Sequence, residues 1–345
     1  MKKLNRDTVI SPPLPEKVLM FGEGNFLRAF AVFLVQKLND GGIFNGGVVA
    51  LQGISQGLAD LINSQDGLYH VIERGVEKAK TIDRATLITS LNRCVNPYEN
   101  YDEFLEIAKN PHLELIISNT TEFGICYNAD ETKDKKIRAN FPAKLTDFLY
   151  NRYLHFGGAL DKGLVILPCE LIEKNADTLK AIIIRYAQDW ELKKDFIDWI
   201  NNANLFANTL VDRIVSGYPK DEAPMICERL GFEDKLLDVC EPFFLWAIEA
   251  DSRLTGRVPL NKSPLNVAIT NNLDFYRVRK VRILNGAHTM SALAGHLCGF
   301  DTVERMIKDE LFERYIKKGL MDEVIPAMQG EGLISYAQDV IERFL

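Results

Sequence analysis

The sequence lacks an apolar run long enough to cross a bilayer. None of its 345 residues lie in a stretch close to the roughly 18 apolar residues that a membrane-spanning helix needs. The start, MKKLNRDTVISPPLPEKV, has lysines but no apolar segment behind them, so it differs from a secretory signal. We therefore expect no membrane partner and no export.

Paired cysteines are also missing. None of the six cysteines forms a C-x-x-C pair, which argues against a zinc ribbon or a disulfide framework. Free thiols suit a reducing compartment, so we expect a cytoplasmic protein. His288, His296 and Cys298 are close in sequence, but the two histidines are eight residues apart, about 12 Å along a helix. Helical zinc ligands are four residues apart, so we expect no metal.

An excess of positive charge is absent too. The formal net charge is −7, and a nucleic-acid partner usually requires a basic surface, so we expect none. The cluster RVRKVR (277–282) runs against this trend. It is either a solvated helix face or a cationic pocket for a small acidic ligand, and the cluster alone does not decide between them.

What the sequence does contain is an alternation of strand and helix patterns in its first half. Such alternation predicts an α/β fold with a parallel sheet covered on both faces, a Rossmann-type doubly wound sheet. The segments 68–75 and 85–95 are rich in β-branched residues and indicate added strands. The main strand patterns lie at 17–22, 48–54, 113–119 and 163–171, and the helical ones at 25–40, 98–110 and 141–156.

From about Asn175 the pattern becomes mainly helical, at 176–190, 192–202 and 276–298. We predict a nucleotide-binding domain with insertions at 1–270 and the start of a helical substrate domain at 271–345. The final segment, ISYAQDVIERFL, is a helical pattern with no capping residue after it. We therefore expect that the helical domain is truncated.

A glycine turn follows the first strand. FGEGNFLRAF (21–30) places G-x-G between a strand and a long helix, where the backbone can approach a pyrophosphate at the helix start. The third glycine of the usual fingerprint is replaced by Leu27. A short G-x-G can be merely structural, but its position in an alternating α/β half favours nucleotide binding.

The acidic residue that normally ends the second strand and holds an adenosine ribose is absent. The segment reads ALQGIS, so Gln52 is the candidate for a ribose hydrogen bond. No lysine or arginine occurs between Lys37 and Arg74, so the loop has no obvious clamp for a 2′-phosphate. This favours NAD over NADP.

The stretch KVRILNGAHTM (280–290) places Lys280, Asn285 and His288 inside an apolar helical pattern. On an ideal α-helix Asn285 lies about 140° and His288 about 80° from Lys280, so one face can carry all three. Reduction of a ketone needs a proton donor and dipoles that stabilise the alkoxide. Burial and the neighbouring arginines could lower the lysine pKa for that role. Core hydrogen bonding is the alternative for Asn285 and His288.

The spacing K-x-x-x-x-N-x-x-H resembles the polyol-specific long-chain dehydrogenases, the family of mannitol dehydrogenase and the hexuronate reductases. This resemblance implies that Lys280 is the general acid/base and that Asn285 and His288 bind and polarise the substrate oxygen, without a metal. It also implies that the glycine turn binds NAD. The cofactor residues expected are Phe21, Gly22, Glu23, Gly24, Asn25, Phe26, Leu27, Arg28, Gln52, Asn119 and Thr120.

Within this family, the segments 118–125, 141–152, 167–176 and 279–289 are most similar to a hexuronate-reducing branch. Leu171 stands where the mannitol enzymes have an asparagine that helps hold the alkoxide. The resemblance implies substrate contacts at Glu170, Asp212 and Arg279. We expect NAD-dependent reduction of a hexuronate ketose, a small sugar-acid substrate, by a monomer or small homo-oligomer. A fructuronate reductase, a mannitol-type dehydrogenase and a non-catalytic NAD-binding sensor are the alternatives.

Overall fold

The computed structural model describes residues 1–120 and 124–345, and its centre is a parallel sheet. Within these residues the sheet has six strands in the order β6-β3-β2-β7-β8-β9, each parallel to its neighbours. Counted along the chain this is the order 3-2-1-4-5-6 of a Rossmann sheet. The predicted doubly wound fold is confirmed. The strands are β2 (Glu16–Phe21), β3 (Gly47–Leu51), β6 (Leu91–Val95), β7 (Leu115–Ser118), β8 (Val165–Pro168) and β9 (Leu205–Phe206).

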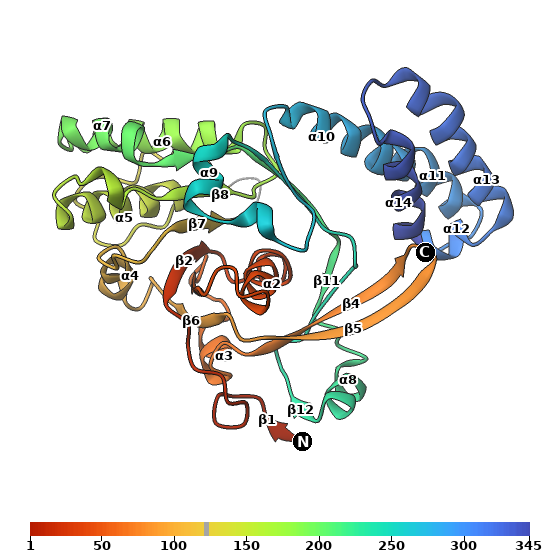
Figure 1. Ribbon diagram of the computed structural model, residues 1–345, viewed down its shortest axis with the longest axis horizontal. Helices are drawn as coiled ribbons and strands as arrows, with labels where there is room; N and C mark the ends of the chain where they lie inside the picture. Colours follow the sequence, from red (N-terminus) through yellow and green to blue (C-terminus); the bar gives the residue numbers. More distant parts are fainter. Residues whose placement is uncertain (121–123) are drawn as a thin grey trace.

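Successive residues of these strands face opposite layers of the core. In β2, Val18 and Met20 belong to one apolar cluster, whereas Leu19 and Phe21 belong to the other. The first cluster includes the helix after β2, and the second includes α4 to α7, which occupy the left and upper left of Figure 1. Because both faces are covered, the strands are almost continuously apolar.

The helices of this part begin and end close to the predicted positions. The helix after β2 runs from Asn25 to Asp40 and contains a π-helical segment, η1. Asn140 caps α5 by accepting a hydrogen bond from Ala143 N–H at 3.2 Å, and Pro142 occupies the first turn. The helices are α1 (Asn25–Leu27), η1 (Arg28–Val32), α2 (Phe33–Asp40), α3 (Ala59–Ser64), α4 (Tyr101–Ile107), α5 (Phe141–His155), η2 (Leu160–Lys162), α6 (Asn175–Asp189) and α7 (Lys194–Ala203).

The region 205–270 corrects the expectation of a mainly helical pattern beyond Asn175. The helices α6 and α7 form as predicted, but mostly strands of two to five residues follow them. These strands are too short for alternation to be visible, and β13 pairs with the distant β4. The elements are β10 (Thr209–Asp212), β11 (Val215–Gly217), α8 (Ala223–Leu230), β12 (Phe232–Glu233), β13 (Asp238–Cys240), β14 (Leu245–Glu249), α9 (Ser252–Arg257), η3 (Leu260–Lys262) and β15 (Val267–Thr270).

These added strands form smaller sheets beside the central one. One has the order β11-β13-β4-β5, another β10-β14-β15, and a short one pairs β1 with β12. The predicted strand at 68–75 corresponds to β4, whereas the predicted segment 85–95 covers the end of β5 and all of β6, which belongs to the central sheet. The strands β4 and β5 form a long antiparallel hairpin. The remaining bounds are β1 (Lys2–Lys3), β4 (Tyr69–Glu77) and β5 (Lys80–Ile88).

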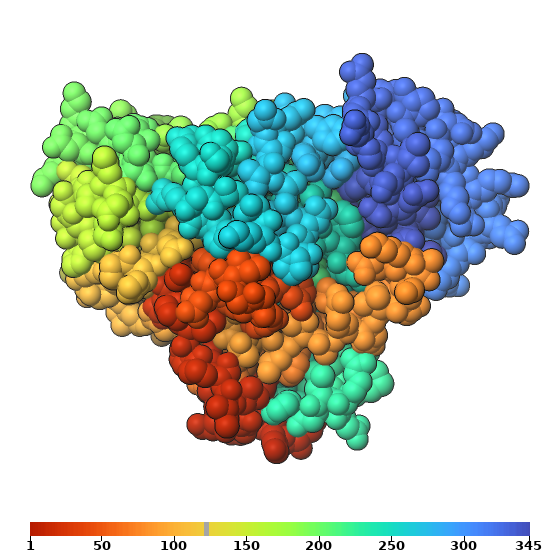
Figure 2. All heavy atoms as spheres, in the orientation of Figure 1, coloured from red at the N-terminus to blue at the C-terminus, as the bar shows by residue number. Residues whose placement is uncertain are grey.

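The C-terminal part is helical and has its own apolar core, which runs from Ile283 to Phe344. Figure 2 shows this part, in blue, as a lobe that touches the tip of the β4–β5 hairpin. There the carboxylate of Glu342 accepts hydrogen bonds from the N–H groups of Lys78 and Ala79. None of the described helices has the length and apolar character needed to cross a bilayer. The helices are α10 (Leu273–Arg279), η4 (Lys280–Asn285), α11 (Gly286–Leu297), α12 (Val303–Ile307), α13 (Glu310–Lys318), η5 (Gly319–Val324), η6 (Ile325–Ala327) and α14 (Leu333–Phe344).

Candidate active site

The turn after β2 has the geometry that a bound pyrophosphate requires. Gly22 has φ +109°, and a Cβ there would lie 3.1 Å from the carbonyl oxygen of Asn119, so glycine is needed. A Cβ on Gly24 would meet no atom within 4 Å, so the space before the helix that starts at Asn25 is open. Backbone N–H groups at a helix start attract phosphate. Gly22 and Gly24 therefore fit the predicted cofactor turn.

Most other side chains of the turn point into the protein core and hold the turn in place. Arg28 is only 1% exposed, and it donates hydrogen bonds to the carbonyl of Leu236 at 2.7 Å and to Asn25 Oδ1 at 2.5 Å. Its guanidinium also lies over the ring of Tyr69. We expected Arg28 to contact the cofactor. In the structure it instead anchors the helix to the core. The apolar members Phe21, Phe26 and Leu27 pack into the two core clusters.

A carboxylate does lie just beyond β3, and it comes from the glycine turn. Glu23 Oε2 accepts a hydrogen bond from Gly53 N–H at 3.0 Å, directly beyond β3. The amide of Gln52 is used within its own loop, because it donates to the carbonyl of Ile54 and accepts from Ala59 N–H. The predicted ribose contact by Gln52 is therefore not available in this arrangement. The sequence named Glu23 only as a member of the glycine turn, because its contact with Gly53, 30 residues away, leaves no local pattern.

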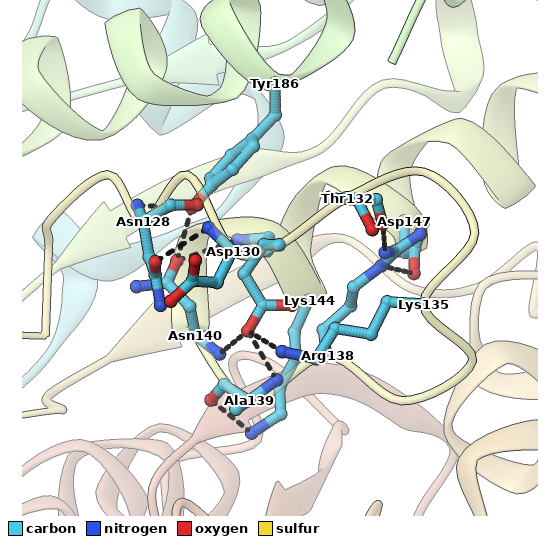
Figure 3. A network of polar contacts seen from close by, with 12 residues as sticks. Asn128, Asp130, Thr132, Lys135, Arg138, Ala139, Asn140, Lys144, Asp147 and Tyr186 are labelled. Carbon is cyan, nitrogen blue, oxygen red and sulfur yellow. Dashed lines mark hydrogen bonds and ion pairs between the residues drawn. The ribbon is translucent and has the colours of Figure 1, made fainter. Parts of the chain in front are cut away.

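Buried Lys144 continues this polar chain beneath the loop that precedes α5 (Figure 3). Its Nζ donates to the Tyr98 hydroxyl at 2.8 Å and to the Ala139 carbonyl at 3.1 Å. Tyr98 in turn donates to the carbonyl of Gly53 at 2.7 Å. Burial lowers the pKa of Lys144 to about 8, although nearby carboxylates act the other way. These contacts fix the loop after β3 on the side where a ribose would lie.

Glu170, just after β8, holds the end of β7. It is 1% exposed, and its Oε1 accepts hydrogen bonds from the N–H and the hydroxyl of Thr120, both at 3.0 Å. Oε2 accepts from Ser118 at 2.9 Å. Burial raises the pKa of this carboxyl group. Glu170 thereby positions the predicted cofactor residues Asn119 and Thr120. Residues 121–123 of the same motif lie outside the described residues.

A cavity of about 390 Å³ lies at the carboxyl edge of the sheet, between the loops after β8 and β9 and the helix formed by α10 and η4. Its volume lies in the range of small-molecule sites, and ligands of open α/β sheets bind at this edge. The lining residues are Glu170, Leu171, Ile172, Glu173, Lys174, Asn208, Thr209, Leu210, Val211, Glu249, Leu273, Asp274, Arg277, Lys280, Val281 and Asn285.

Lys280 and Asn285 face this cavity together because the segment between them is π-helical. The π-helical segment η4 begins at Lys280 and ends at Asn285. A π-helix bonds residue i to residue i+5, so residues five apart lie one above the other. On the ideal α-helix assumed from the sequence, Asn285 would lie about 140° away. The wider turn corrects that estimate and brings both side chains to the cavity.

The amine of Lys280 is removed from bulk water. Its side chain is 19% exposed, and Nζ donates to the carbonyl of Val211 at 2.9 Å. Burial lowers the pKa of Lys280, Arg343 lowers it further, and Asp212, whose Oδ1 lies 4.0 Å from Nζ, opposes the shift. A lower pKa brings the amine closer to the balance of protonated and neutral forms that a general acid and base needs.

Asp212, predicted to contact substrate, lies behind Lys280 instead of lining the cavity. It is 3% exposed, and both oxygens are bonded to Arg343, at 2.8 and 3.1 Å. Tyr336 donates to Oδ2 at 2.7 Å, and Glu241 binds the other side of Arg343 at 2.8 Å. Asp212 therefore joins β10 to α14, and its carboxylate lies 4.0 Å from the Lys280 amine.

Two other predicted residues also lie away from the cavity lining. His288 is exposed, and its ring packs against Phe344 with centroids 5.0 Å apart. Arg279 points into the helical lobe, where its guanidinium lies over the rings of Phe275, Tyr276 and Tyr336. In the part of the chain that the structure describes, no cluster of three or more His, Cys, Asp or Glu side chains could hold a metal ion.

Sequence reasoning did not single out Lys174, Asn208 and Glu249, which line the cavity, and it named Arg277 only as a member of the basic cluster 277–282. Helical periodicity could have indicated Arg277, which lies three residues before Lys280. Asn208 does not replace the asparagine missing at Leu171, because its amide donates to Asp177 and Glu249 and its oxygen accepts from Ala176 N–H. Lys174 reaches the cavity because the loop after β8 lies beside α10, and this contact between distant segments leaves no pattern in the sequence.

Comparisons with known proteins agree with this architecture. The model of the mannitol dehydrogenase Rossmann domain matches residues 16–262, and that of the mannitol dehydrogenase C-terminal domain matches residues 272–345. Curated proteins called altronate oxidoreductase, from Shigella flexneri and from Escherichia coli O1:K1 / APEC, are 44% identical over 347 aligned residues. These alignments cover 100% of this chain and 72% of each relative.

Two solved structures share the fold. A D-sorbitol dehydrogenase in substrate-free form has a TM-score of 0.84 at 23% identity, covering 100% of this chain and 75% of that one. Mannitol 2-dehydrogenase from Pseudomonas fluorescens, in a ternary complex with NAD and D-mannitol, has a TM-score of 0.77 at 20% identity, covering 99% and 73%. With both domain models matched and the curated relatives aligned along its whole length, the chain belongs to the mannitol dehydrogenase family.

Proposed function

We propose that the chain is an NAD-dependent oxidoreductase that reduces the ketone of a hexuronate, D-tagaturonate to D-altronate, and catalyses the reverse oxidation. The observation that carries the proposal is that Lys280 and Asn285 line one cavity at the carboxyl edge of a Rossmann sheet. The substrate pair is supported by the 44% identity to proteins called altronate oxidoreductase. The chain spans 72% of the length of those relatives.

The residues of the glycine turn fit NAD. Gly22 and Gly24 would hold the pyrophosphate with the N–H groups before Asn25, because no side chain fills the space at Gly24. The carboxylate of Glu23, which accepts hydrogen bonds from the N–H groups of Gly53 and Leu58, places negative charge beside the loop after β3 and repels a 2′-phosphate, which favours NAD over NADP. When bound, the nicotinamide supplies the hydride for the ketone carbon, and NAD is also named in the complex of the mannitol 2-dehydrogenase with the same fold.

Lys280 moves the proton at the substrate oxygen. In reduction its ammonium group donates a proton to that oxygen, and in oxidation the neutral amine removes it. Because burial lowers the pKa of Lys280, both forms become accessible nearer neutral pH. The carbonyl of Val211 fixes the direction of the amine. The amide of Asn285 donates to the same substrate oxygen and stabilises its developing charge. His288 stays a proposed substrate contact on its K-x-x-x-x-N-x-x-H spacing alone, because its ring lies outside the cavity lining, against Phe344.

A substrate panel tests this function. We expect NADH to be oxidised with D-tagaturonate at a higher kcat/KM than with D-fructuronate or D-fructose, and NADPH to be a poorer donor. A preference for D-fructuronate or D-fructose would assign the chain to another member of the family. Binding of NADH without oxidation by any of these substrates would identify a non-catalytic sensor and contradict the proposal.

Three further properties are part of the proposal. We propose that the protein lies in the cytoplasm, because all six cysteines, which are among the described residues, are free thiols. The division into a cofactor domain at 1–270 and a substrate domain at 271–345 is supported by the separate apolar core of the helical lobe. A monomer or small homo-oligomer is the proposed assembly, which light scattering measures directly.

A further inference from the structure

The charged residues that line the cavity differ in whether they can bind a substrate carboxylate. Its cationic lining residues are Lys174, Arg277 and Lys280, and Lys280 is committed to the reacting oxygen in the proposed function. The acidic residues Glu170, Glu173, Glu249 and Asp274 also line it. A sugar acid that enters this space needs a cation for its carboxylate, because desolvating an unpaired anion is costly.

The other arginines of the basic cluster do not meet this need. Arg279 lies over three aromatic rings of the helical lobe, with its Nε buried among them. Arg282 is exposed and borders a separate shallow groove near Met328. Of the arginines in RVRKVR, Arg277 alone is among the cavity-lining residues described by the structure.

The position of Arg277 matches the shape of the proposed substrate. It lies three residues before Lys280, so both side chains share one helix face about one turn apart. A hexuronate ketose carries its ketone and its carboxylate near opposite ends of a six-carbon chain. With the ketone oxygen at Lys280, the carboxylate must be held at a distance, within reach of a long side chain such as arginine.

The present partners of Arg277 are easy to displace. Nη2 lies 3.0 Å from Asp274 Oδ1 and 3.6 Å from Glu173 Oε1. The arginine side chain is 42% exposed, and the two carboxylates are 75% and 63% exposed. Exposed pairs of this kind contribute little to stability. A substrate carboxylate in bidentate contact with the planar guanidinium forms stronger, charge-assisted hydrogen bonds.

We propose that Arg277 binds the carboxylate of the substrate and that Asp274 and Glu173 hold its guanidinium at the cavity until the substrate replaces them. This inference rests on the proposed function, since it assumes a sugar-acid substrate. It makes Arg277 the residue that selects sugar acids over neutral ketoses and polyols. Lys174, on the loop after β8, adds positive charge to the same cavity.

Binding to the NADH complex tests the inference without requiring turnover. D-altronate and D-altritol differ only in having a carboxylate or a hydroxymethyl group at one end, and neither oxidises NADH. We expect Arg277→Leu to weaken D-altronate binding about 10- to 100-fold, while D-altritol binding changes less than about twofold. Arg277→Lys restores part of the loss, because it keeps the charge without the planar fork. Asp274→Asn tightens D-altronate binding, because it removes a competing carboxylate.

The matched control is Arg305→Leu, another exposed arginine that pairs with an acid of its own segment, Asp301, at 3.0 Å. It should change neither affinity. Wild-type affinity for D-altronate in Arg277→Leu, equal losses for both ligands, or no D-altronate binding to the wild-type chain would each overturn the inference. Failure of the wild-type chain to oxidise NADH with D-tagaturonate would instead overturn the proposed function and leave the binding comparison to decide the role of Arg277.

Discussion

The guanidinium of Arg343 lies 2.8 Å from the carboxylate of Asp212, and this contact joins the last helix to β10 across 131 residues. Tyr336 donates to the same carboxylate at 2.7 Å. With its oxygens occupied in this way, Asp212 only partly offsets the effect of burial on the Lys280 amine 4.0 Å away. The helical lobe therefore helps to keep the pKa of Lys280 low.

Tyr336→Phe tests this coupling with little disturbance of packing. Loss of the hydroxyl leaves the Asp212 carboxylate freer to attract the Lys280 ammonium, so the pKa of Lys280 rises. Oxidation of D-altronate needs the neutral amine, so its rate increases as pH rises through that pKa. We expect the midpoint of the pH–rate profile to move to higher pH, at a stability cost of about 1 kcal/mol.

The control for this change is Tyr315→Phe, because Tyr315 is an exposed tyrosine of the same lobe that donates to the carbonyl of Met290 at 3.2 Å. Its pH–rate profile should coincide with that of the wild type. If Tyr336→Phe leaves the midpoint where it was, Asp212 does not act on Lys280 in the way described.

Lys280→Ala removes the proposed proton donor. We expect kcat for D-tagaturonate reduction to fall by about 10²- to 10⁴-fold, with NADH affinity unchanged. Because burial of the ammonium opposes folding, the melting temperature should not decrease. Lys308→Ala, at an exposed lysine paired with Glu304, is the control for loss of a positive charge. Turnover close to wild type in Lys280→Ala would remove Lys280 from the mechanism.

Gly24→Ala separates a cofactor turn from a merely structural one. The added methyl group meets no protein atom, and the backbone of Gly24 has φ −67°, so the fold should be as stable as before or more so. The methyl group does occupy the space proposed for the pyrophosphate. We expect NADH binding to weaken at least about tenfold, since close backbone approach is lost.

Gly256→Ala is the matched control, because a Cβ at this helical glycine also meets nothing within 4 Å, and it should leave NADH binding intact. Gly22→Ala has a different effect, because φ +109° and the nearby Asn119 carbonyl make it destabilising. Unchanged NADH affinity in Gly24→Ala would show that the cofactor does not use this turn.

Asp238→Asn tests whether the buried carboxyl group of Asp238 makes the stability of the chain depend on pH. Burial raises the pKa of Asp238 to about 7, although Arg28, 3.6 Å away, lowers it. Between the unfolded value of 3.8 and about 7, the folded chain keeps a proton that the unfolded chain has lost. This carboxyl group therefore makes the chain less stable as pH rises through that window, and it adds no further change above it.

We expect the free energy of unfolding of the wild type, measured by urea titration, to decrease by about 2 kcal/mol relative to Asp238→Asn between pH 5 and pH 7. The exposed variant Asp60→Asn should keep the wild-type pH dependence. Parallel pH curves for the wild type and Asp238→Asn would mean that the carboxyl group is already ionised at pH 5 in the folded chain.

Local patterns were sufficient for the central part of the fold. The alternation of apolar strands and helices from Glu16 to Pro168 depends on side-chain periodicity, which each segment carries by itself. The short strands between Leu205 and Thr270 were missed because they contain few residues and pair with distant segments such as β4. Pairing of that kind depends on which surfaces meet and not on local composition.

Local sequence patterns were enough to predict the glycine turn after the first strand and the shared helical segment of Lys280 and Asn285. Which side chains reach the cavity depends on packing between elements and could not be predicted from those patterns. Arg277 and Arg279 have the same chemistry and differ by two positions, yet one lines the cavity and the other lies among aromatic rings. The orientation of Lys280 and Asn285 depends on how their helix is wound, which is π-helical between them. The contacts of Glu23 with Gly53 and of Arg343 with Asp212 depend on packing between segments that are distant in the chain. Periodicity gives the direction of a side chain around its own helix or strand, whereas its contacts are set by how the elements pack against one another.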